Sequence, residues 1–252
     1  MSSDGSSRVC LLLEKTFTDS KKWSLESLAL SDKQAICVAF LNAHAVTLSY
    51  SREEIFTPLM SSDFLLRDGI GVKLALKLFG YADTENLNGT DLIPKILNQF
   101  SGKEISIWGA SDVALTECKR KLAENHINNI VSLEHGFHDP EHYVRMAEER
   151  NPEIVVLCMG MPKQEKLAKI LQERNLCRLV ICGGGWADFY SENKKRAPLW
   201  VRKISMEWLH RLVCEPRRLG RRYTLGILDF FYIIIKTYAS RRPSTKNMDN
   251  YS

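Results

Sequence analysis

Short apolar segments that alternate with longer segments of helical pattern are the feature that most constrains the fold of this chain. The predicted strands are Ile36–Leu41, Glu104–Trp108, Asn129–Leu133, Ile154–Met159 and Leu179–Cys182. The predicted helices are Arg52–Met60, Gly71–Phe79, Asp91–Phe100, Val113–Asn125, Glu141–Glu149 and Lys163–Arg174. Nearly unbroken apolar strands are typical of parallel sheets whose two faces are both buried under helices. We therefore predict an α/β fold with a mostly parallel sheet flanked by helices.

The pattern changes after about Ala197. Trp200–Leu212 is predicted to be helical, a second helix can begin at Pro216, and Gly226–Ala239 has apolar residues at helical spacing. We predict three parts: a core over residues 1–196, a basic, amphipathic C-terminal appendage over 197–240, and a disordered tail over 241–252.

Composition excludes several classes of protein. The formal net charge is only +5, but the excess of basic residues lies in the last quarter of the chain. The seven cysteines form no CxxC pair, which is typical of buried thiols in a reducing compartment. The N-terminal residues lack the basic start of a secretory signal, and no apolar run approaches the roughly 20 residues that span a bilayer. We expect a cytoplasmic protein.

Ligands of open parallel sheets bind beyond the carboxyl ends of the strands. The residues at these positions are Asn42, Gly109, Gly160 and Gly183. We expect the binding site among them.

The motif Asp68-Gly69-Ile70-Gly71 follows the apolar run Phe64–Leu66. A carboxylate at a junction between loop and helix, next to glycines that allow close approach of a ligand, suits a general base. The same spacing also fits an aspartate that caps the following helix, and local pattern alone favours the cap.

Two further motifs have a structural and a functional interpretation. Asn88-Gly89-Thr90-Asp91 has the pattern of a turn followed by a helix cap. Gly160-Met161-Pro162-Lys163-Gln164-Glu165 follows a buried strand and opens a helix. Its amides can hold phosphate or sugar oxygens and Gln164 can bind a base or sugar, or the segment is an ordinary turn between strand and helix.

Several cofactor signatures are absent from the sequence. Gly183-Gly184-Gly185 lacks the GxGxxG spacing of dinucleotide-binding folds, which disfavours a nicotinamide-dependent enzyme. No Walker A motif occurs, and no two aspartates stand two residues apart. The histidines lack zinc-site spacing, and HGFHDPEH (135–142) is interpreted as a loop. We predict no cofactor and no metal.

A segment rich in basic residues follows the Gly183-Gly184-Gly185 motif. Its cations are Lys194, Lys195, Arg196, Arg202, Lys203, Arg211, Arg217, Arg218, Arg221 and Arg222. Like charges so close together repel one another unless an anion or an acidic partner lies between them. A solvated basic face is the simpler interpretation, but interleaved Trp200, Trp208 and Tyr223 are typical of an element that binds anionic headgroups and a diphosphate at a membrane surface.

Five blocks together resemble the WecG/TagA/CpsF family of glycosyltransferases. They are LNAHAV (41–46), DGIGV (68–72), NGTDLIP (88–94), GMPKQE (160–165) and the segment from GGGWADF (183–189) through KRAPLW and MEWLHRL to EPRRLGRRY (215–223). The resemblance implies a Rossmann-like core with an appendage that docks on it and reaches the membrane.

The resemblance also implies the reaction. Such enzymes transfer a hexose or N-acetylhexosamine from a UDP-sugar to a sugar linked to polyprenyl (undecaprenyl) diphosphate, with inversion and without a metal. They act peripherally at the inner face of the cell membrane, in teichoic acid or exopolysaccharide biosynthesis. The implied partners are the UDP-sugar, the lipid-linked acceptor and the membrane surface, but no nucleic acid; a homo-oligomer is left open.

By position in the matching blocks, Asp68 is the predicted base that deprotonates the acceptor. The predicted substrate-binding residues are Asn42, Gly69, Asn88, Asp91, Gly160, Gln164, Asp188, Arg196, Arg211, Arg218, Arg221 and Arg222. Phe40 and Asn86 depart from the threonine and arginine that family members often carry at these positions. Both departures border the predicted sugar pocket.

A second hypothesis comes from a different class of function. The basic segment could belong to a non-catalytic module that binds anionic lipid or nucleic acid. The two hypotheses differ in the role that they give to Asp68, which only the enzyme needs as a base.

Overall fold

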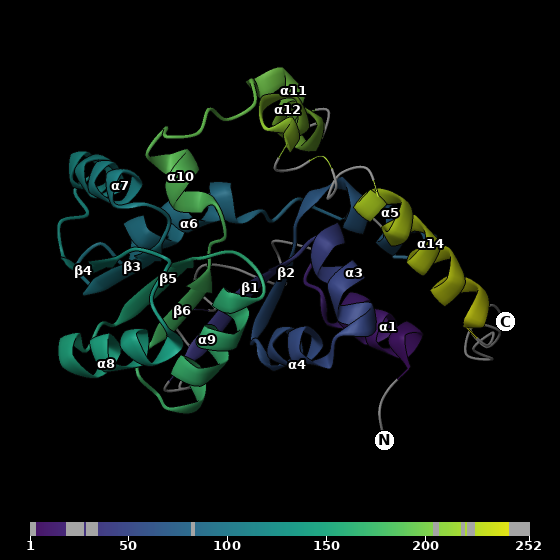
Figure 1. The fold of residues 1–252 in the computed structure, drawn as a ribbon, viewed down its shortest axis with the longest axis horizontal. Coiled ribbons are helices and arrows are strands. Elements are labelled where there is room, and N and C mark those ends of the chain that lie inside the picture. The colour runs from purple at the N-terminus through teal and green to yellow at the C-terminus, as the bar shows by residue number, and fades with distance from the viewer. Residues whose placement is uncertain are drawn as a thin grey trace, which may run out of the picture.

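A six-stranded parallel sheet forms the centre of the protein. The computed structural model describes residues 4–18, 28, 35–81, 84–203, 207–217, 220 and 225–241. The strand order is β2-β1-β6-β5-β3-β4, and every pair of neighbours is parallel (Figure 1). The predicted α/β fold class is confirmed.

Five of the six strands were predicted from their apolar sequences. The strands are β1 (Ile36–Leu41), β2 (Phe64–Arg67), β3 (Ile105–Gly109), β4 (Ile130–Glu134), β5 (Ile154–Cys158) and β6 (Leu179–Cys182). The sequence pattern did not identify β2 as a strand, because this segment is short and ends in a charged residue. Arg67 is nevertheless buried, since its guanidinium donates hydrogen bonds to the carbonyl oxygens of Glu85 and Gly69.

Helices cover both faces of the sheet. They are α1 (Gly5–Lys15), α3 (Ala43–Ser51), α4 (Glu53–Ser61), α5 (Gly69–Leu78), α6 (Gly89–Gln99), α7 (Asp112–Glu124), α8 (Pro140–Arg150), α9 (Lys163–Glu173), α10 (Trp186–Tyr190), α11 (Leu199–Lys203), α12 (Glu207–Cys214) and α14 (Leu225–Ser240).

The sequence patterns missed three of these helices and misjudged one segment. Helices α1, α3 and α10 were not predicted, although α1 buries Val9, Leu12 and Leu13 at helical spacing. The described residues of the segment predicted as a helix over Trp200–Leu212 are helical and belong to α11 and α12, and residues 204–206 between them lie outside the described part. The expectation that HGFHDPEH is a loop is wrong at its end, because α8 begins at Pro140 and contains His142.

The two faces of each strand bury different helices. On β1, Ile36, Val38 and Phe40 pack in the core layer that contains α6, α7 and α10. The intervening residues Cys37 and Ala39 pack in the layer that contains α1, α3, α4 and α9. This double burial explains why the strands lack polar alternation.

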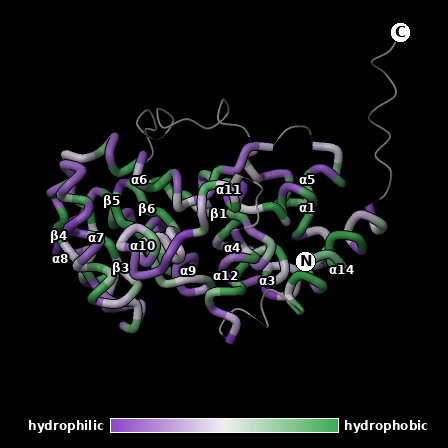
Figure 2. The backbone as a smooth tube through the Cα atoms, turned by 90° about the horizontal axis from the view of Figure 1, so that it is seen from above, coloured by the Kyte–Doolittle hydropathy of each residue, from purple (hydrophilic) through white to green (hydrophobic). Residues whose placement is uncertain are grey.

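The last described helix packs on the core. On α14, Phe230, Ile233 and Ile234 are buried, and they join the same hydrophobic cluster as α1 and α3. Helices α14 and α5 lie at one end of the molecule, and α7 and α8 lie at the other end, in both views (Figures 1 and 2). The domain boundary at residue 196 stays a prediction, and the predicted disordered tail lies outside the described residues from position 242 onward.

Candidate functional site

A cavity of about 400 Å³ opens at the carboxyl ends of four neighbouring strands. Asn42 follows β1, Asp68 follows β2, Gly160 lies beyond β5 and Gly183 follows β6, and all four residues line the cavity. These strands are consecutive in the sheet order β2-β1-β6-β5. The parallel topology therefore gathers loops from distant parts of the sequence around one site.

Six of the predicted site residues line this cavity: Asn42, Asp68, Gly160, Gln164, Asp188 and Arg211. Gly69, Asn88, Asp91 and Arg196 are not among the lining residues, although Gly89 and Thr90 of the same motif are. Arg218, Arg221 and Arg222 lie outside the described residues. Gly109 does not line the cavity either. It is needed where β3 meets β5, because a Cβ at this position would lie 2.3 Å from the carbonyl carbon of Cys158.

Asp68 occupies the position before α5, but its side chain makes no capping hydrogen bond. The turn around it is held by neighbouring groups. The Gly69 N–H donates to Asn86 Oδ1 at 3.0 Å, and Arg67 donates to the Gly69 carbonyl at 2.9 Å. Gly69 has a φ of +84°, a conformation that glycine adopts without strain. Asn86, which stands where family members often carry an arginine, therefore contacts the turn that carries Asp68.

Gln164 connects the two glycine loops that follow β5 and β6. Its Oε1 accepts hydrogen bonds from the N–H groups of Gly160 at 3.2 Å and Gly184 at 2.9 Å. Its Nε2 donates to Glu165 Oε1 at 2.8 Å. The Gln164 oxygen is therefore engaged by the protein itself, and the side chain fixes the shape of the cavity wall.

Glu165 is a site residue that the sequence patterns did not single out. It lines the cavity, only 3% of the residue is exposed, and burial raises the pKa of its carboxyl to about 7. Among the described residues, its Oε2 has no hydrogen-bond partner. The sequence could have indicated this site residue, because Glu165 directly follows Gln164, a predicted substrate-binding residue, in the first turn of α9.

Asn42 and Asn88 both act as helix caps. Asn42 Oδ1 accepts from Ala45 N at 3.0 Å, so this pocket residue also fixes the start of α3. Asn88 Oδ1 accepts from Asp91 N at 3.0 Å, and its Nδ2 donates to Asp91 Oδ2 at 2.8 Å. For the Asn88 motif, the turn-and-cap interpretation accounts for the observed contacts.

Asp91 and Arg196 form an ion pair that ties the end of the core to α6. Arg196 NH1 donates to Asp91 Oδ1 at 2.7 Å, and Arg202 approaches the same oxygen at 3.9 Å. Burial acts to raise the pKa of Asp91, but the hydrogen bonds from Arg196 and Asn88 outweigh it and lower the pKa. These two arginines, which look like anion ligands in the sequence, are ion-paired within the fold.

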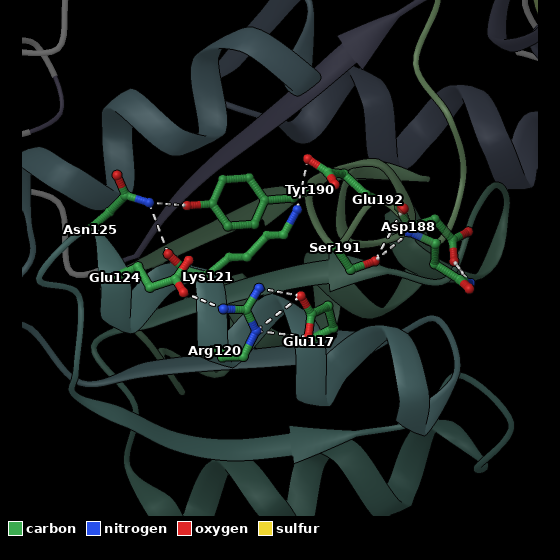
Figure 3. Close-up of polar contacts among 10 residues, drawn as sticks. Glu117, Arg120, Lys121, Glu124, Asn125, Asp188, Tyr190, Ser191 and Glu192 are labelled. Carbon is green, nitrogen blue, oxygen red and sulfur yellow. Dashed lines mark hydrogen bonds and ion pairs between the residues drawn. The ribbon is translucent and has the colours of Figure 1, made fainter.

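A second cavity, of about 470 Å³, lies beside this ion pair and is lined in part by Lys121, Tyr190 and Glu192. Figure 3 shows its polar wall: Lys121 contacts Glu192 at 2.8 Å, and Asn125 Nδ2 donates to the Tyr190 hydroxyl at 3.2 Å. The lysine of this second cavity is therefore already ion-paired.

Two cations reach the first cavity from the basic segment. Lys194 Nζ lies 2.5 Å from Asp188 Oδ2, so this pair is already formed. Arg211, on α12, lies over the Phe189 ring, with its guanidinium carbon 4.3 Å from the ring centroid. The cavity therefore combines a carboxylate at Asp68 with a guanidinium at Arg211, between two glycine loops that Gln164 connects. This set can accept a proton and stabilise a departing anion.

The described helices include none that is long and apolar enough to cross a membrane.

Comparison with known proteins agrees with this architecture. The model of the "Glycosyl transferase WecG/TagA/CpsF family" matches residues 16–244. A relative in Bacillus subtilis (strain 168), the N-acetylglucosaminyldiphosphoundecaprenol N-acetyl-beta-D-mannosaminyltransferase, is 27% identical over 213 residues, which cover 81% of this chain and 83% of that protein. The family match covers nearly the whole chain, including every strand of the sheet. This chain therefore belongs to the WecG/TagA/CpsF family of glycosyltransferases.

Proposed function

We propose that this protein is an inverting, metal-independent hexosyltransferase that uses a UDP-sugar donor and an acceptor sugar linked to undecaprenyl diphosphate. The observation that carries the proposal is the convergence of Asp68, the two glycine loops and Arg211 on one cavity. The name of the Bacillus subtilis relative, which specifies a diphosphoundecaprenol acceptor, supports the acceptor class. The product belongs to the synthesis of a cell-envelope polymer.

The proposed reaction is a single displacement. The acceptor hydroxyl oxygen attacks the anomeric carbon of the donor while the Asp68 carboxylate takes the hydroxyl proton. The bond between the anomeric carbon and the UDP oxygen breaks, and UDP leaves with the electron pair. One displacement inverts the configuration at the anomeric carbon.

The departing diphosphate needs positive charge or oriented amides. The Arg211 guanidinium supplies positive charge at the cavity wall. The chain also has no pair of aspartates two residues apart, the pattern by which many sugar-nucleotide enzymes hold a metal. Arg211 takes the role that a metal has in those enzymes.

We place the protein peripherally on the inner face of the membrane because α14 is apolar on both sides. Its outward residues are Leu228, Phe231, Tyr232, Ile235 and Tyr238, which are 40–67% exposed. Leu74 and Leu78 of the neighbouring α5 are exposed too, and the Phe79 ring contacts Tyr238 at 5.6 Å. Lys73, Lys77 and Lys236 lie on the same two helices. An apolar face flanked by lysines suits the surface of an anionic bilayer.

The proposal is tested by assaying Asp68→Asn with a panel of UDP-sugars and a short-chain lipid-diphosphate acceptor. We expect sugar transfer to fall by about 10²–10⁴-fold, while donor binding is retained, because the variant lacks only the base. Asp112→Asn, at the start of α7 and outside the cavity, is the matched control and should keep full activity.

Two results would count against the proposal. Full activity of Asp68→Asn would show that the base is another group. If the wild-type protein turned over no UDP-sugar, the non-catalytic binding module would become the better hypothesis.

A further inference from the structure

Two histidines and a glutamate converge at the carboxyl end of the edge strand β4. Glu134 is the last residue of β4, His138 lies in the following loop, and His142 lies in the first turn of α8. Their ligand atoms all lie within 4.8 Å of one another. None of the three lines the cavity that contains Asp68. The contiguous sequence hides this group, because its members belong to a strand, a loop and a helix.

Two of the three ligand-atom distances match those around a tetrahedral metal ion. Glu134 Oε2 lies 3.1 Å from His142 Nε2 and 3.6 Å from His138 Nε2. Ligand atoms about 2.0–2.1 Å from a tetrahedral zinc ion lie roughly 3.4 Å from one another. The His138 and His142 rings are stacked, with centroids 3.8 Å apart, so the two rings must turn apart for both nitrogens to point at one ion.

The loop that carries His138 is held in place by its own contacts. The His138 N–H donates to the Tyr143 hydroxyl at 3.3 Å, and this hydroxyl donates to the His135 carbonyl at 2.6 Å. Lys163 Nζ donates to the carbonyl oxygens of Gly136, at 2.9 Å, and of His138. These contacts hold the backbone of the loop that carries His138 in place before an ion binds.

We propose that Glu134, His138 and His142 form a binding site for a divalent transition-metal ion of the zinc class. Two imidazoles and one carboxylate are a donor set that zinc accepts, with the fourth position open to water. The ion replaces the direct contact between His142 Nε2 and Glu134 Oε2.

The position of the site points to a structural role. The site lies at the end of the molecule that carries β4 and α8, opposite α14 (Figures 1 and 2). Lys163, which neighbours Gln164, connects the loop of the site to the catalytic region. The bound ion thus stabilises the loop over residues 135–139 and the start of α9, and it takes no part in sugar transfer.

The test is zinc titration of the full chain by calorimetry, with thermal unfolding as a second readout. All proteins carry Cys214→Ser, because the Cys214 thiol lies 3.9 Å from His210 Nε2 on α12 and could also bind zinc. We expect one saturable site per chain and a higher Tm with zinc. The variants His138→Ala, His142→Ala and Glu134→Gln should each weaken binding by at least about 10-fold.

His135→Ala is the matched control. The His135 ring stacks on His138 at 4.0 Å, but its Nδ1 accepts from the Phe137 N–H, so this variant should bind zinc like its parent. Lack of saturable binding, or equal binding by parent and ligand variants, would overturn the site. If zinc removal abolished sugar transfer, the structural role would be wrong.

Discussion

The Arg211 guanidinium of α12 stacks on the Phe189 ring of α10, with 4.3 Å between its central carbon and the ring centroid. A residue of the predicted C-terminal appendage thereby lines the cavity at the carboxyl ends of the strands. Stacking holds the cation in place and leaves the edge of the guanidinium available for an anion. This contact links the appendage to the proposed chemistry.

Arg211→Ala should lower kcat/KM for sugar transfer by roughly 10- to 150-fold, since a hydrogen bond to a charged group contributes about 1.5–3 kcal/mol. Arg211→Lys should retain part of the activity, because it keeps the charge but loses the planar fork. Steady-state kinetics measure both effects. Lys195→Ala removes the same charge from an exposed position, and comparable losses in this control would contradict a specific role for Arg211.

Asn86→Ala should reduce kcat more than it changes KM. The substitution removes the acceptor of the Gly69 N–H and loosens the turn that positions Asp68, at a cost of about 1 kcal/mol in stability. Initial rates measure the loss of kcat, and urea denaturation measures the loss of stability. Asn98→Ala, at an exposed position of α6, should leave both unchanged. An unaltered kcat in Asn86→Ala would mean that Asp68 is positioned by other contacts.

Glu165 should make the folded state less stable as the pH rises. Its pKa is raised from 4.5 to about 7, so between these values the folded protein binds more protons than the unfolded chain does. The free energy of unfolding then falls with increasing pH across this window, by about 3 kcal/mol in total, and stays level above it.

Glu165→Gln should remove this pH dependence and make the protein more stable than the parent above about pH 7. Urea denaturation across about pH 5 to 8 measures the effect. Glu173→Gln, on the exposed end of the same helix, should keep the slope of the parent. A parent-like slope in Glu165→Gln would assign the titration to another group.

Two adjacent phenylalanines of α14 should have opposite roles. Phe230 is 1% exposed, and truncation to alanine should lower the free energy of unfolding by about 3–5 kcal/mol. Phe231 is 40% exposed, and its truncation should cost less than about 1 kcal/mol but weaken binding to anionic vesicles about 10-fold. Sedimentation with vesicles and denaturant unfolding separate the two effects. Parent-like vesicle binding by Phe231→Ala would argue against the outward face of α14 as the membrane contact.

The strands show which parts of the fold the apolar sequence pattern can locate. β1, β5 and β6 are almost entirely apolar because helices cover both of their faces, so each could be located to within one residue. β2 escaped the pattern, since it ends in Arg67, whose burial is compensated by hydrogen bonds to the carbonyl groups of Glu85 and Gly69. A local sequence pattern does not show which carbonyl groups will accept hydrogen bonds from a buried arginine.

Some residues of the candidate site could also be predicted from the sequence, and others could not. Asn42, Asp68 and Gly160 could be placed in the cavity because they stand just beyond apolar runs, and the carboxyl ends of parallel strands share one edge. The basic segment could not be resolved in this way. Arg196 and Arg211 are equivalent as sequence, but Arg196 pairs with Asp91 while Arg211 reaches the cavity.

The sequence by itself therefore determined the parallel sheet and its loop edge, because strands buried on both faces leave apolar runs between helical patterns, and its five motif blocks determined the family. Only the tertiary structure decided which charges are paired, why Glu165 is hard to ionise, and that Glu134, His138 and His142 meet. The physical reason is that ion pairing, desolvation and ligand convergence depend on distances between segments far apart in the chain or in different elements.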